Sequence, residues 1–252
     1  MNITIDGKSC QCEKGEYILQ IARRNGIIIP TLCHHDGFPG QGSCRLCIVE
    51  VNEGNGPKVV VSCVYPVSKE CVVFTNSEKI RKQRGLILTL LQKRAPDSEE
   101  IKAFGKMYQA PQIDRFVKAD SGKCILCGLC VKACAELSVG AISTVNRGIT
   151  KEIATPYHEP SSVCVGCGSC AYVCPTNAIE IEESEETRTI WGKTFKFVRC
   201  ASCGEVIGTE EELAYAAKKA GTEPDVLCGH CRKKDLAKAF RHTYGEIRPE
   251  EK

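Results

Sequence analysis

The chain has 252 residues, with 34 Lys and Arg against 31 Asp and Glu, for a formal net charge of +3. A charge this small gives no electrostatic reason to expect nucleic acid as a partner. No stretch of the sequence approaches the roughly 18 consecutive apolar residues of a membrane span, so we expect no direct membrane insertion.

Cysteine usage is the strongest compositional signal. Nineteen cysteines combined with few aromatic residues favour several small, metal-stapled domains over one large core. A disulfide scaffold would require secretion, but the start MNITIDG has neither a basic n-region nor an apolar h-region. We therefore expect a cytoplasmic protein.

The chain begins with a pattern typical of a β-hairpin followed by a helix. Residues 2–5 alternate as a strand does, Asp6-Gly7 predicts a turn, and residues 8–13 return as a second strand. Residues 15–25 place apolar side chains at helical spacing and end at Asn25-Gly26.

A group of four cysteines follows, with gaps of ten, two and fifteen residues. The glycine-rich loop at residues 35–43 allows the backbone to curl over a flat cluster, so the pattern predicts a 2Fe-2S cluster held by four thiolates. Zinc is the alternative, because four cysteines alone do not exclude it. The predicted ligands are Cys33, Cys44, Cys47 and Cys63.

Other residues near this motif are not expected to bind metal. A Rieske centre would need two histidines in place of two cysteines, so we expect His34 and His35 to be polar loop residues. Cys10, Cys12 and Cys71 lack ligand spacing, and we expect them to be buried or half-buried in the sheet.

Residues 1 to about 75 resemble the 2Fe-2S domain of the large iron-sulfur subunit of complex I and its hydrogenase and formate dehydrogenase relatives. The matching segments are IPTLCHH at 29–35, GSCRLC at 42–47 and SC at 62–63. The resemblance implies a β-grasp fold with the cluster near its surface and the helix at 15–25 packed on the sheet. We assign this domain to residues 1–76.

Residues 77–119 are predicted to form a helical linker. Ser77 opens a helix over 77–94, and Ser98 caps a second helix that runs through Tyr108. The complex I subunit carries a histidine and three cysteines for another 4Fe-4S cluster here, whereas residues 94–109 contain neither residue type. Electrons must then pass to the next clusters directly or through a partner. One face of the first helix is predicted to be apolar, formed by Ile80, Leu86, Ile87, Leu90 and Leu91.

Two cysteine runs with C-x2-C-x2-C-x3-C spacing follow, the second ending in Pro175. Three thiolates on such a loop reach three irons of one 4Fe-4S cube, and the fourth ligates the other cube in a two-cluster ferredoxin. Zinc and disulfides are the alternatives. The predicted ligand sets are Cys124, Cys127, Cys130 with Cys174, and Cys164, Cys167, Cys170 with Cys134.

We assign the double 4Fe-4S ferredoxin-like domain to residues 120–186. Residues 140–143 and 176–181 are predicted to start two symmetry-related strands, with a hairpin insertion around Arg147-Gly148. The acidic run at 180–186 is expected to be a solvated connector.

Residues 187–252 contain a fourth motif, in which a helix-like segment at 210–220 separates two C-x2-C pairs. This is the layout of a structural zinc ribbon or treble clef, so we favour one zinc bound by Cys200, Cys203, Cys228 and Cys231. An iron-sulfur cluster or a rubredoxin-like iron is the alternative, because thiolate count does not choose the metal. The basic helix at 233–242 is expected to be a docking element or a solvated face.

Together these modules predict an α+β chain without a catalytic residue of its own. Clusters held only by cysteine lack an open coordination site, so they support one-electron transfer rather than substrate turnover. No G-x-G-x-x-G fingerprint follows a predicted strand, and no phosphate-binding loop is present. The sequence therefore predicts an electron-transfer protein.

The combination of modules resembles the iron-sulfur subunit of soluble NAD-linked nickel-iron hydrogenases, including electron-bifurcating ones. That resemblance implies a flavin- and NAD(P)-binding subunit as one partner and a catalytic hydrogenase subunit as the other, with soluble ferredoxin as a further partner in a bifurcating complex. A formate dehydrogenase complex is the alternative for the same relay. A redox-sensing regulator, in which the zinc ribbon contacts nucleic acid, is the alternative from another functional class.

Overall fold

The computed structural model describes residues 1–115, 119 and 122–245. The chain divides into two compact units, which are described separately. The first consists of Met1–Ser138, Ile142–Ala154 and Ser169–Ile179, and the second of Val139–Ala141, Thr155–Gly168 and Glu180–Lys252. The boundary assigned at residue 120 lies outside the described residues. Every helix among those residues is too short or too polar to cross a membrane.

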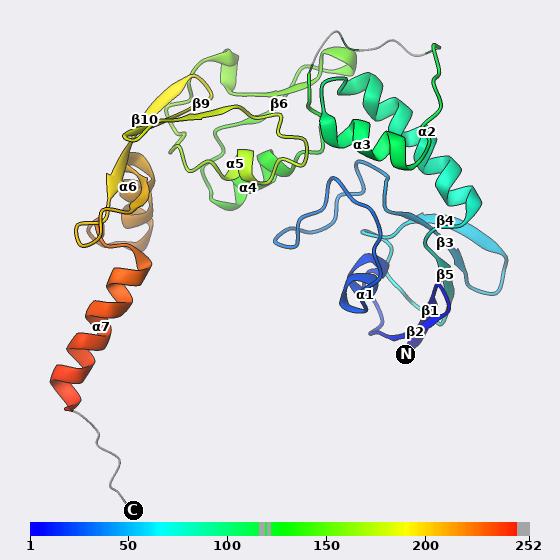
Figure 1. The fold of residues 1–252 in the computed structure, drawn as a ribbon, viewed down its shortest axis with the longest axis horizontal. Helices are drawn as coiled ribbons and strands as arrows, with labels where there is room; N and C mark the ends of the chain where they lie inside the picture. Colours follow the sequence, from blue (N-terminus) through cyan, green and yellow to red (C-terminus); the bar gives the residue numbers. More distant parts are fainter. Residues whose placement is uncertain (116–118, 120–121, 246–252) are drawn as a thin grey trace, which may run out of the picture. The chain divides into compact units, whose positions relative to one another are not determined.

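A five-stranded mixed sheet with the order β2-β1-β5-β3-β4 opens the first unit (Figure 1). β1 runs antiparallel to β2 and parallel to β5. The predicted hairpin is confirmed, and its turn places Asp6 and Gly7 at positive φ. The strands are β1 (Asn2–Ile5), β2 (Lys8–Gln11), β3 (Ile48–Asn52), β4 (Pro57–Val61) and β5 (Val72–Phe74).

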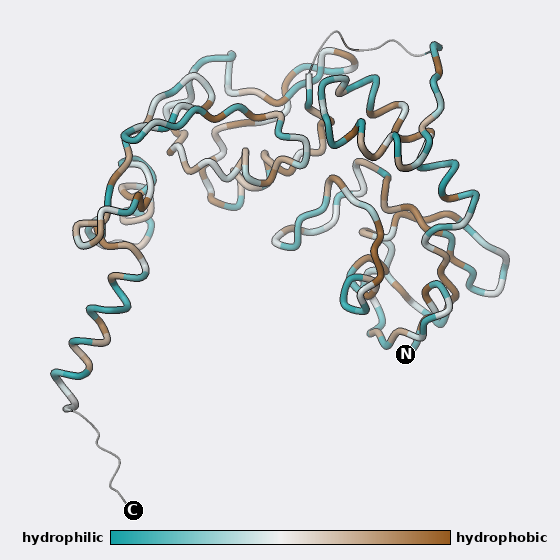
Figure 2. The backbone as a smooth tube through the Cα atoms, in the orientation of Figure 1, coloured by the Kyte–Doolittle hydropathy of each residue, from teal (hydrophilic) through white to brown (hydrophobic). Residues whose placement is uncertain are grey.

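Helix α1 (Ile18–Arg24) packs its apolar side chains into the core of this sheet. It begins three residues later than predicted, at Ile18 instead of Gly15. Apolar stretches run through α1 and the strands (Figure 2). Cys10, Cys12 and Cys71 are buried in this core, as expected from their lack of ligand spacing.

Helices α2 (Glu78–Arg94) and α3 (Glu99–Met107) confirm the predicted linker helices and their caps. The Ser77 hydroxyl accepts a hydrogen bond from the amide of Ile80, and the Ser98 hydroxyl accepts one from the amide of Ile101. These bonds satisfy amides that a helix N-terminus otherwise leaves without an acceptor.

The predicted apolar face of α2 is confirmed in part. Ile80 is buried and Ile87 and Leu91 pack against a core cluster, whereas Leu86 and Leu90 are 42% and 49% exposed. The fully buried stripe is Ile80, Arg84 and Leu88, residues spaced by four that lie one above the other on a helix. A charged residue occupies the centre of the packed side, which a pattern of apolar residues does not predict.

Short elements surround the cysteine runs. Helices α4 (Leu129–Glu136) and α5 (Ser169–Tyr172) pack together (Figure 1). Strands β6 (Ser143–Val145) and β7 (Glu152–Ala154) form a hairpin across the 3-10 turn η1 (Gly148–Thr150), which confirms the predicted insertion. A second 3-10 turn is η2 (Pro156–His158).

The second unit is built on a four-stranded antiparallel sheet with the order β11-β10-β9-β8. The acidic run predicted to be a connector contains strand β8, because residues 181–183 pair with β9 while Glu182 and Glu183 keep exposed side chains. The predicted ferredoxin strands start at Ser143 and Ile181 and pair with β7 and β9 respectively. The strands are β8 (Ile181–Glu183), β9 (Thr187–Ile190), β10 (Lys193–Arg199) and β11 (Val206–Thr209).

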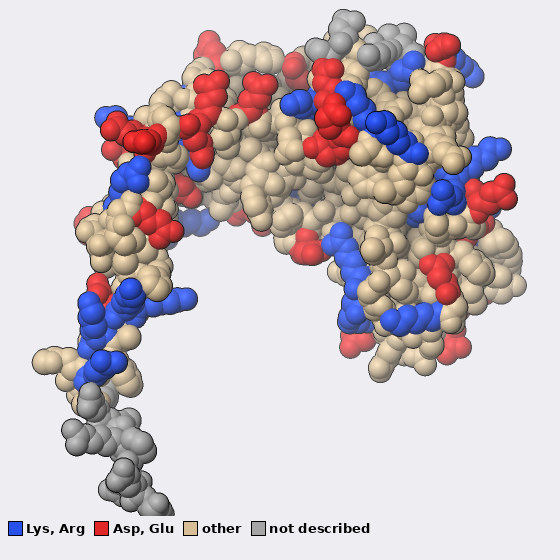
Figure 3. Space-filling view, viewed as in Figure 1, with Lys and Arg blue, Asp and Glu red and all other residues tan. Residues whose placement is uncertain are grey.

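Two helices complete this unit. Helix α6 (Glu210–Ala220) spans the residues predicted for it and begins with a capping box between Thr209 and Glu212. Helix α7 (Gly229–Tyr244) extends beyond the predicted 233–242. Basic side chains gather along it (Figure 3), and its apolar residues Leu236 and Phe240 are 64% and 62% exposed.

Candidate metal centres

The four cysteines of the first motif are all buried and form two interacting pairs. The thiol of Cys33 lowers the pKa of Cys44 to about 6 through a hydrogen bond, and the thiol of Cys63 lowers that of Cys47 to about 7 in the same way. The amide of Cys44 also donates to Cys33 Sγ at 3.2 Å. The structure thus brings the predicted thiols together as two pairs, as a cluster with two irons requires.

Gly40 allows the loop at residues 35–43 to come close to the fourth cysteine. A Cβ atom at residue 40 would lie 2.1 Å from the carbonyl oxygen of Cys63. This distance is far below any van der Waals contact, so only glycine fits there. The predicted role of this loop, a close approach of backbone to the cluster ligands, agrees with that geometry.

His34 differs from the expected polar loop residue. Its side chain is only 8% exposed, and its Nδ1 atom is buried without a hydrogen-bond partner. Burial is the main cause that lowers the pKa of His34. The nearest carboxylate, that of Asp36, lies 3.7 Å from Nδ1, beyond hydrogen-bond reach.

In the next motif, the first unit contains one complete predicted ligand set: Cys124, Cys127, Cys130 and Cys174. Burial raises the pKa of Cys127 to about 11 and that of Cys130 to about 12. The Cys127 thiol also interacts electrostatically with Cys174, so the fourth cysteine of the second run lies close to the first run. This proximity agrees with the crossed ligand set, which stays a prediction.

Backbone amides approach the sulfur atoms of this set. The amide of Leu126 donates to Cys124 Sγ at 3.4 Å, and the amide of Ala178 donates to Cys174 Sγ at 3.2 Å. Such hydrogen bonds stabilise thiolates and influence the reduction potential of a bound cluster.

The two ligand sets of the first unit share one apolar core. Cys33, Cys44 and Leu46 from the first domain pack in the same cluster as Ile125, Cys127 and Leu129. The Cys127 thiol interacts electrostatically with Cys44. Lys132 Nζ donates to the carbonyl of Pro39 at 3.0 Å and ties the two loops together. This packing agrees with the predicted direct route from the first motif to the nearer cube.

The remaining predicted cube has ligands from both units: Cys134 and Cys170 belong to the first, and Cys164 and Cys167 to the second. Within the second unit, three side chains donate to three consecutive carbonyls of the Cys164 loop. Lys193 Nζ donates to Cys164 at 3.0 Å, Thr209 Oγ1 donates to Val165, and Arg188 Nη1 donates to Gly166 at 2.8 Å.

An aromatic ring completes this arrangement. Phe195 is 1% exposed, and a Cβ atom at residue 166 would lie 2.5 Å from its ring. We call Arg188, Lys193, Phe195 and Thr209 the loop clamp. Sequence reasoning missed it, because these residues share no motif spacing with the cysteines they support.

The last four cysteines form one compact site, here called the C-terminal thiol site. The sulfur atoms of Cys200, Cys203, Cys228 and Cys231 all lie within 4.8 Å of one another. The amide of Cys228 is the main cause that lowers the pKa of Cys200 to about 6. Four convergent thiols, one already favoured as thiolate, match the donor set of a soft metal ion.

Comparison with known proteins agrees with this arrangement of sites. Residues 1–78 match the family of 2Fe-2S iron-sulfur cluster binding domains, and residues 123–178 and 163–207 match the 4Fe-4S dicluster domain. The NADP-reducing hydrogenase subunit HndD of Solidesulfovibrio fructosivorans is 33% identical over 210 residues, which cover 71% of this chain and 36% of that protein. The chain is a homologue of subunits of NAD(P)-linked hydrogenases and of NADH-ubiquinone oxidoreductase.

One further curated protein and one solved structure are also similar to this chain. The NADH-ubiquinone oxidoreductase 75 kDa subunit of Reclinomonas americana is 29% identical over 215 residues, 76% of this chain and 31% of that protein. A chain from the crystal structure of NAD+-reducing NiFe-hydrogenase in the H2-reduced state superposes with a TM-score of 0.59 at 26% identity, and the match covers 70% of this chain and 85% of that one. The chain spans about a third of the length of HndD and of the 75 kDa subunit, 36% and 31% respectively.

Proposed function

We propose that this chain is an electron relay in a multisubunit NAD(P)-linked hydrogenase complex. It would pass single electrons between a flavin- and NAD(P)-binding subunit and a catalytic hydrogenase subunit. The observation that carries the proposal is the shared core of the first unit, in which the loops of two ligand sets pack together around Cys44 and Cys127. A relay needs clusters in close succession, and this packing supports that arrangement.

The proposed clusters and ligands are those predicted from the sequence. In the 2Fe-2S site, the two interacting pairs support ligation of one iron by Cys33 and Cys44 and of the other by Cys47 and Cys63. The strand order with parallel β1 and β5 supports the β-grasp assignment of residues 1–76. Once bound, each cluster takes up and releases one electron. The protein supplies thiolates, amide donors and apolar surroundings.

The two proposed cubes follow the crossed ligand sets. Cys124, Cys127 and Cys130 with Cys174 would hold the cube nearer the 2Fe-2S site, called the proximal cube here. Cys164, Cys167 and Cys170 with Cys134 would hold the other, called the distal cube. We propose that residues 187–252 form a separate module whose loop clamp supports the distal cube.

Zinc is our proposal for the C-terminal thiol site. Its four thiols converge on one position, as a tetrahedral zinc site requires. The second dicluster match ends at residue 207 and so includes Cys200 and Cys203. Because two of the four cysteines fall within that match, an iron-sulfur cluster is the alternative to zinc at the C-terminal thiol site.

The names of the relatives favour one class of partner. They are subunits of an NADP-reducing hydrogenase, NADH-ubiquinone oxidoreductases and an NADPH-Fe(3+) oxidoreductase. These names favour NAD(P)-linked partners of the hydrogenase kind over a formate dehydrogenase. We further propose, from the resemblance, that such a complex bifurcates electrons to soluble ferredoxin.

Metal content and spectroscopy test the proposal. Anaerobic purification of the full chain should give about ten irons, from one two-iron and two four-iron clusters, and about one zinc. Reduction should produce separate electron paramagnetic resonance signals for the 2Fe-2S and 4Fe-4S centres. About two irons would exclude the two cubes, and about fourteen irons without zinc would make the C-terminal thiol site a third cube. Anaerobic co-purification, with identification of the attached subunits, tests the partners.

A further inference from the structure

Arg84 is a buried charged residue in the middle of α2. It is 1% exposed and is among the largest fully buried side chains of the described residues. Its guanidinium group lies 5.5 Å from the ring centroid of Tyr108, and its Nη1 atom is 3.4 Å from the phenol oxygen. The charge of arginine is permanent, because its pKa stays far above neutral pH even when burial lowers it, as it does here.

The other two hydrogen bonds of Arg84 surround a predicted cluster ligand. Nε donates to the carbonyl of Leu46 at 2.9 Å, and Nη2 donates to the carbonyl of Ile48 at 2.8 Å. The residue between them is Cys47, and its thiol attracts the guanidinium electrostatically. Arg84 therefore holds both neighbours of a 2Fe-2S ligand and places its charge beside that ligand.

This charge has no carboxylate partner among the described residues. Its hydrogen bonds go to two carbonyls and one phenol, and Cys47 is among the groups that attract it electrostatically. An isolated buried charge is strongly unfavourable, so buried charges are normally paired. The neighbouring thiolate site can balance this charge.

A 2Fe-2S site with four cysteines is a suitable counterion. Its four thiolates carry more charge than the iron-sulfide core, so the site is anionic, and one-electron reduction makes it more so. A fixed cation nearby stabilises the reduced form more than the oxidised form, because Coulomb attraction grows with the charge of the site. Net charge is one of the factors that set cluster potentials.

We propose that Arg84 is the built-in counterion of the 2Fe-2S cluster and raises its reduction potential. This inference rests on the proposed function, since it requires that the cluster is present. Arg84 is a positioning residue that acts through its charge and through the backbone around Cys47. The simpler role, an anchor of α2 on β3, predicts lower stability after substitution but no selective change in one potential.

The test is a redox titration of the full chain, monitored by electron paramagnetic resonance, with the R84M, R84Q and R84K variants. R84M and R84Q remove the charge, and R84Q keeps a donor for the backbone carbonyls, whereas R84K keeps the charge. We expect the equilibrium constant for reduction of the 2Fe-2S cluster to fall at least tenfold in R84M and R84Q. For a one-electron couple this lowers the reduction potential by about 59 mV. R84K should keep most of the wild-type potential, and the cube potentials should not change in any variant.

Arg81 supplies a matched control. It lies on the same helix, is exposed, and places its guanidinium 5.8 Å from the same Tyr108 ring. R81M should leave all potentials unchanged. Equal 2Fe-2S potentials in wild type, R84Q and R84K would overturn the proposal, and so would an equal shift of all clusters. If R84M does not fold, the 2Fe-2S reduction potentials of R84Q and R84K still show whether the charge at residue 84 sets the potential. Absence of a 2Fe-2S signal from the wild-type protein would instead refute the proposed function.

Discussion

Lys193 Nζ lies 3.0 Å from the carbonyl oxygen of Cys164, so a side chain of β10 holds the backbone of a predicted cluster ligand. The lysine is 24% exposed, and its charge also lies 4.6 Å from the ring centroid of Phe195. The sheet formed by β8–β11 thus supports a loop whose first cysteine lies 29 positions before Lys193. This contact gives strand β10 a role in holding the Cys164 loop.

Removing the Lys193 contact should weaken the distal cube. We expect K193M to lower stability by about 1 kcal/mol, since a hydrogen bond to a charged group contributes roughly 1.5–3 kcal/mol and partial exposure reduces this. Iron should then be lost to a chelator faster, and the fast phase should contain about four irons. The K196M variant is the control, because Lys196 is an exposed residue on the same strand. Equal rates of iron loss in the two variants would contradict the prediction.

Gly166 should not tolerate a side chain. G166A would bring a Cβ atom to 2.5 Å from the buried Phe195 ring and would also strain the backbone at φ +69°. We expect iron content to fall from about ten to about six per chain, as the distal cube is lost. G221A is the matched control: Gly221 has φ +67° but open space around its Cβ position. The G221A variant should lose only about 1–2 kcal/mol of stability, because alanine is strained in the left-handed backbone conformation, and it should keep all the iron. Full iron content in G166A would show that the loop can move.

Disruption of the C-terminal thiol site should affect the second unit selectively. We expect C231S to lose the bound zinc, about one equivalent, and to lose amide protection in β11 and α6 by hydrogen exchange. The 2Fe-2S signal should persist, because its ligands belong to the first unit. C10A is the control, since Cys10 is a buried core residue without ligand spacing and should keep about ten irons and one zinc. Loss of iron without loss of zinc in C231S would argue for an iron-sulfur occupant.

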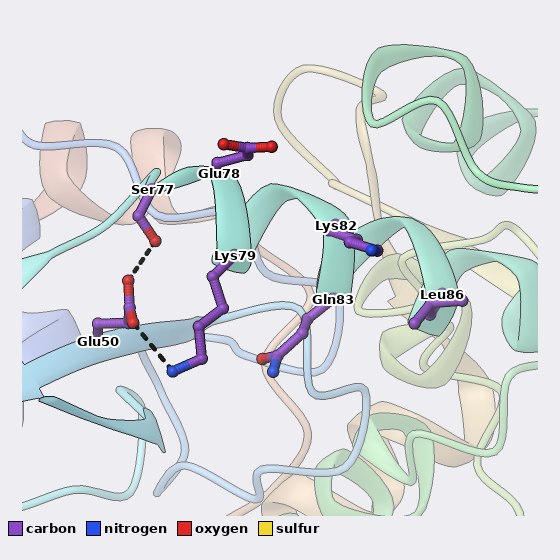
Figure 4. Close-up of a pocket in the computed structure, with 7 residues that line it drawn as sticks. All are labelled: Glu50, Ser77, Glu78, Lys79, Lys82, Gln83 and Leu86. Carbon is purple, nitrogen blue, oxygen red and sulfur yellow. Dashed lines mark hydrogen bonds and ion pairs between the residues drawn. The ribbon is translucent and has the colours of Figure 1, made fainter.

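Acid should loosen the junction of β3 with α2. Glu50 accepts a hydrogen bond from the Ser77 hydroxyl and pairs with Lys79 at 3.1 Å, beside a surface groove (Figure 4). The Ser77 bond, followed by the lysine, lowers the pKa of Glu50. A lowered pKa in the folded state means that the ionised carboxylate stabilises the fold at neutral pH. The ordinary pKa of glutamate is about 4.3, so the stabilisation is complete above that pH. It is lost as the pH falls from about 4.3 through the lowered pKa of Glu50 in the folded protein.

The E50Q variant tests this pH dependence. At pH 7 it should be less stable than wild type, and the difference in urea denaturation should shrink as the pH falls through that window. S77A should show a similarly reduced pH dependence and should also lose about 1 kcal/mol from the missing N-cap. If the difference in unfolding free energy between wild type and E50Q stays constant from pH 7 to acidic pH, ionised Glu50 does not stabilise the fold as proposed.

Local signals in the sequence predicted the features that depend on local chemistry. The cysteine spacings predict the ligand sets, because thiolates on a tight loop must have those separations to reach a cluster, and the structure brings the thiols of the first motif and of the C-terminal thiol site together. Ser77 and Ser98 predicted two helix starts correctly, since a cap acts within one turn.

Features that depend on distant residues were missed. Glu182 and Glu183 were assigned to a connector because their partners in β9 are not visible in an acidic run. Arg84 occupies the packed face of α2, and its burial makes sense only with the carbonyls beside Cys47, 36 to 38 residues away. The loop clamp likewise joins residues that are 22 to 44 positions apart.

The shared core of the first unit limits how this protein can be divided. Leu46 is fully buried, and it belongs to the same core cluster as Leu88 of α2 and Ile125 and Leu129 of the Cys124 loop and α4. A fragment that ends at residue 76 would uncover that apolar surface, although its four cluster ligands would all be present. An engineer who wishes to transplant the 2Fe-2S centre into another oxidoreductase should therefore carry α2 and the Cys124 loop with it. The smallest portable part would therefore contain both predicted ligand sets of the first unit.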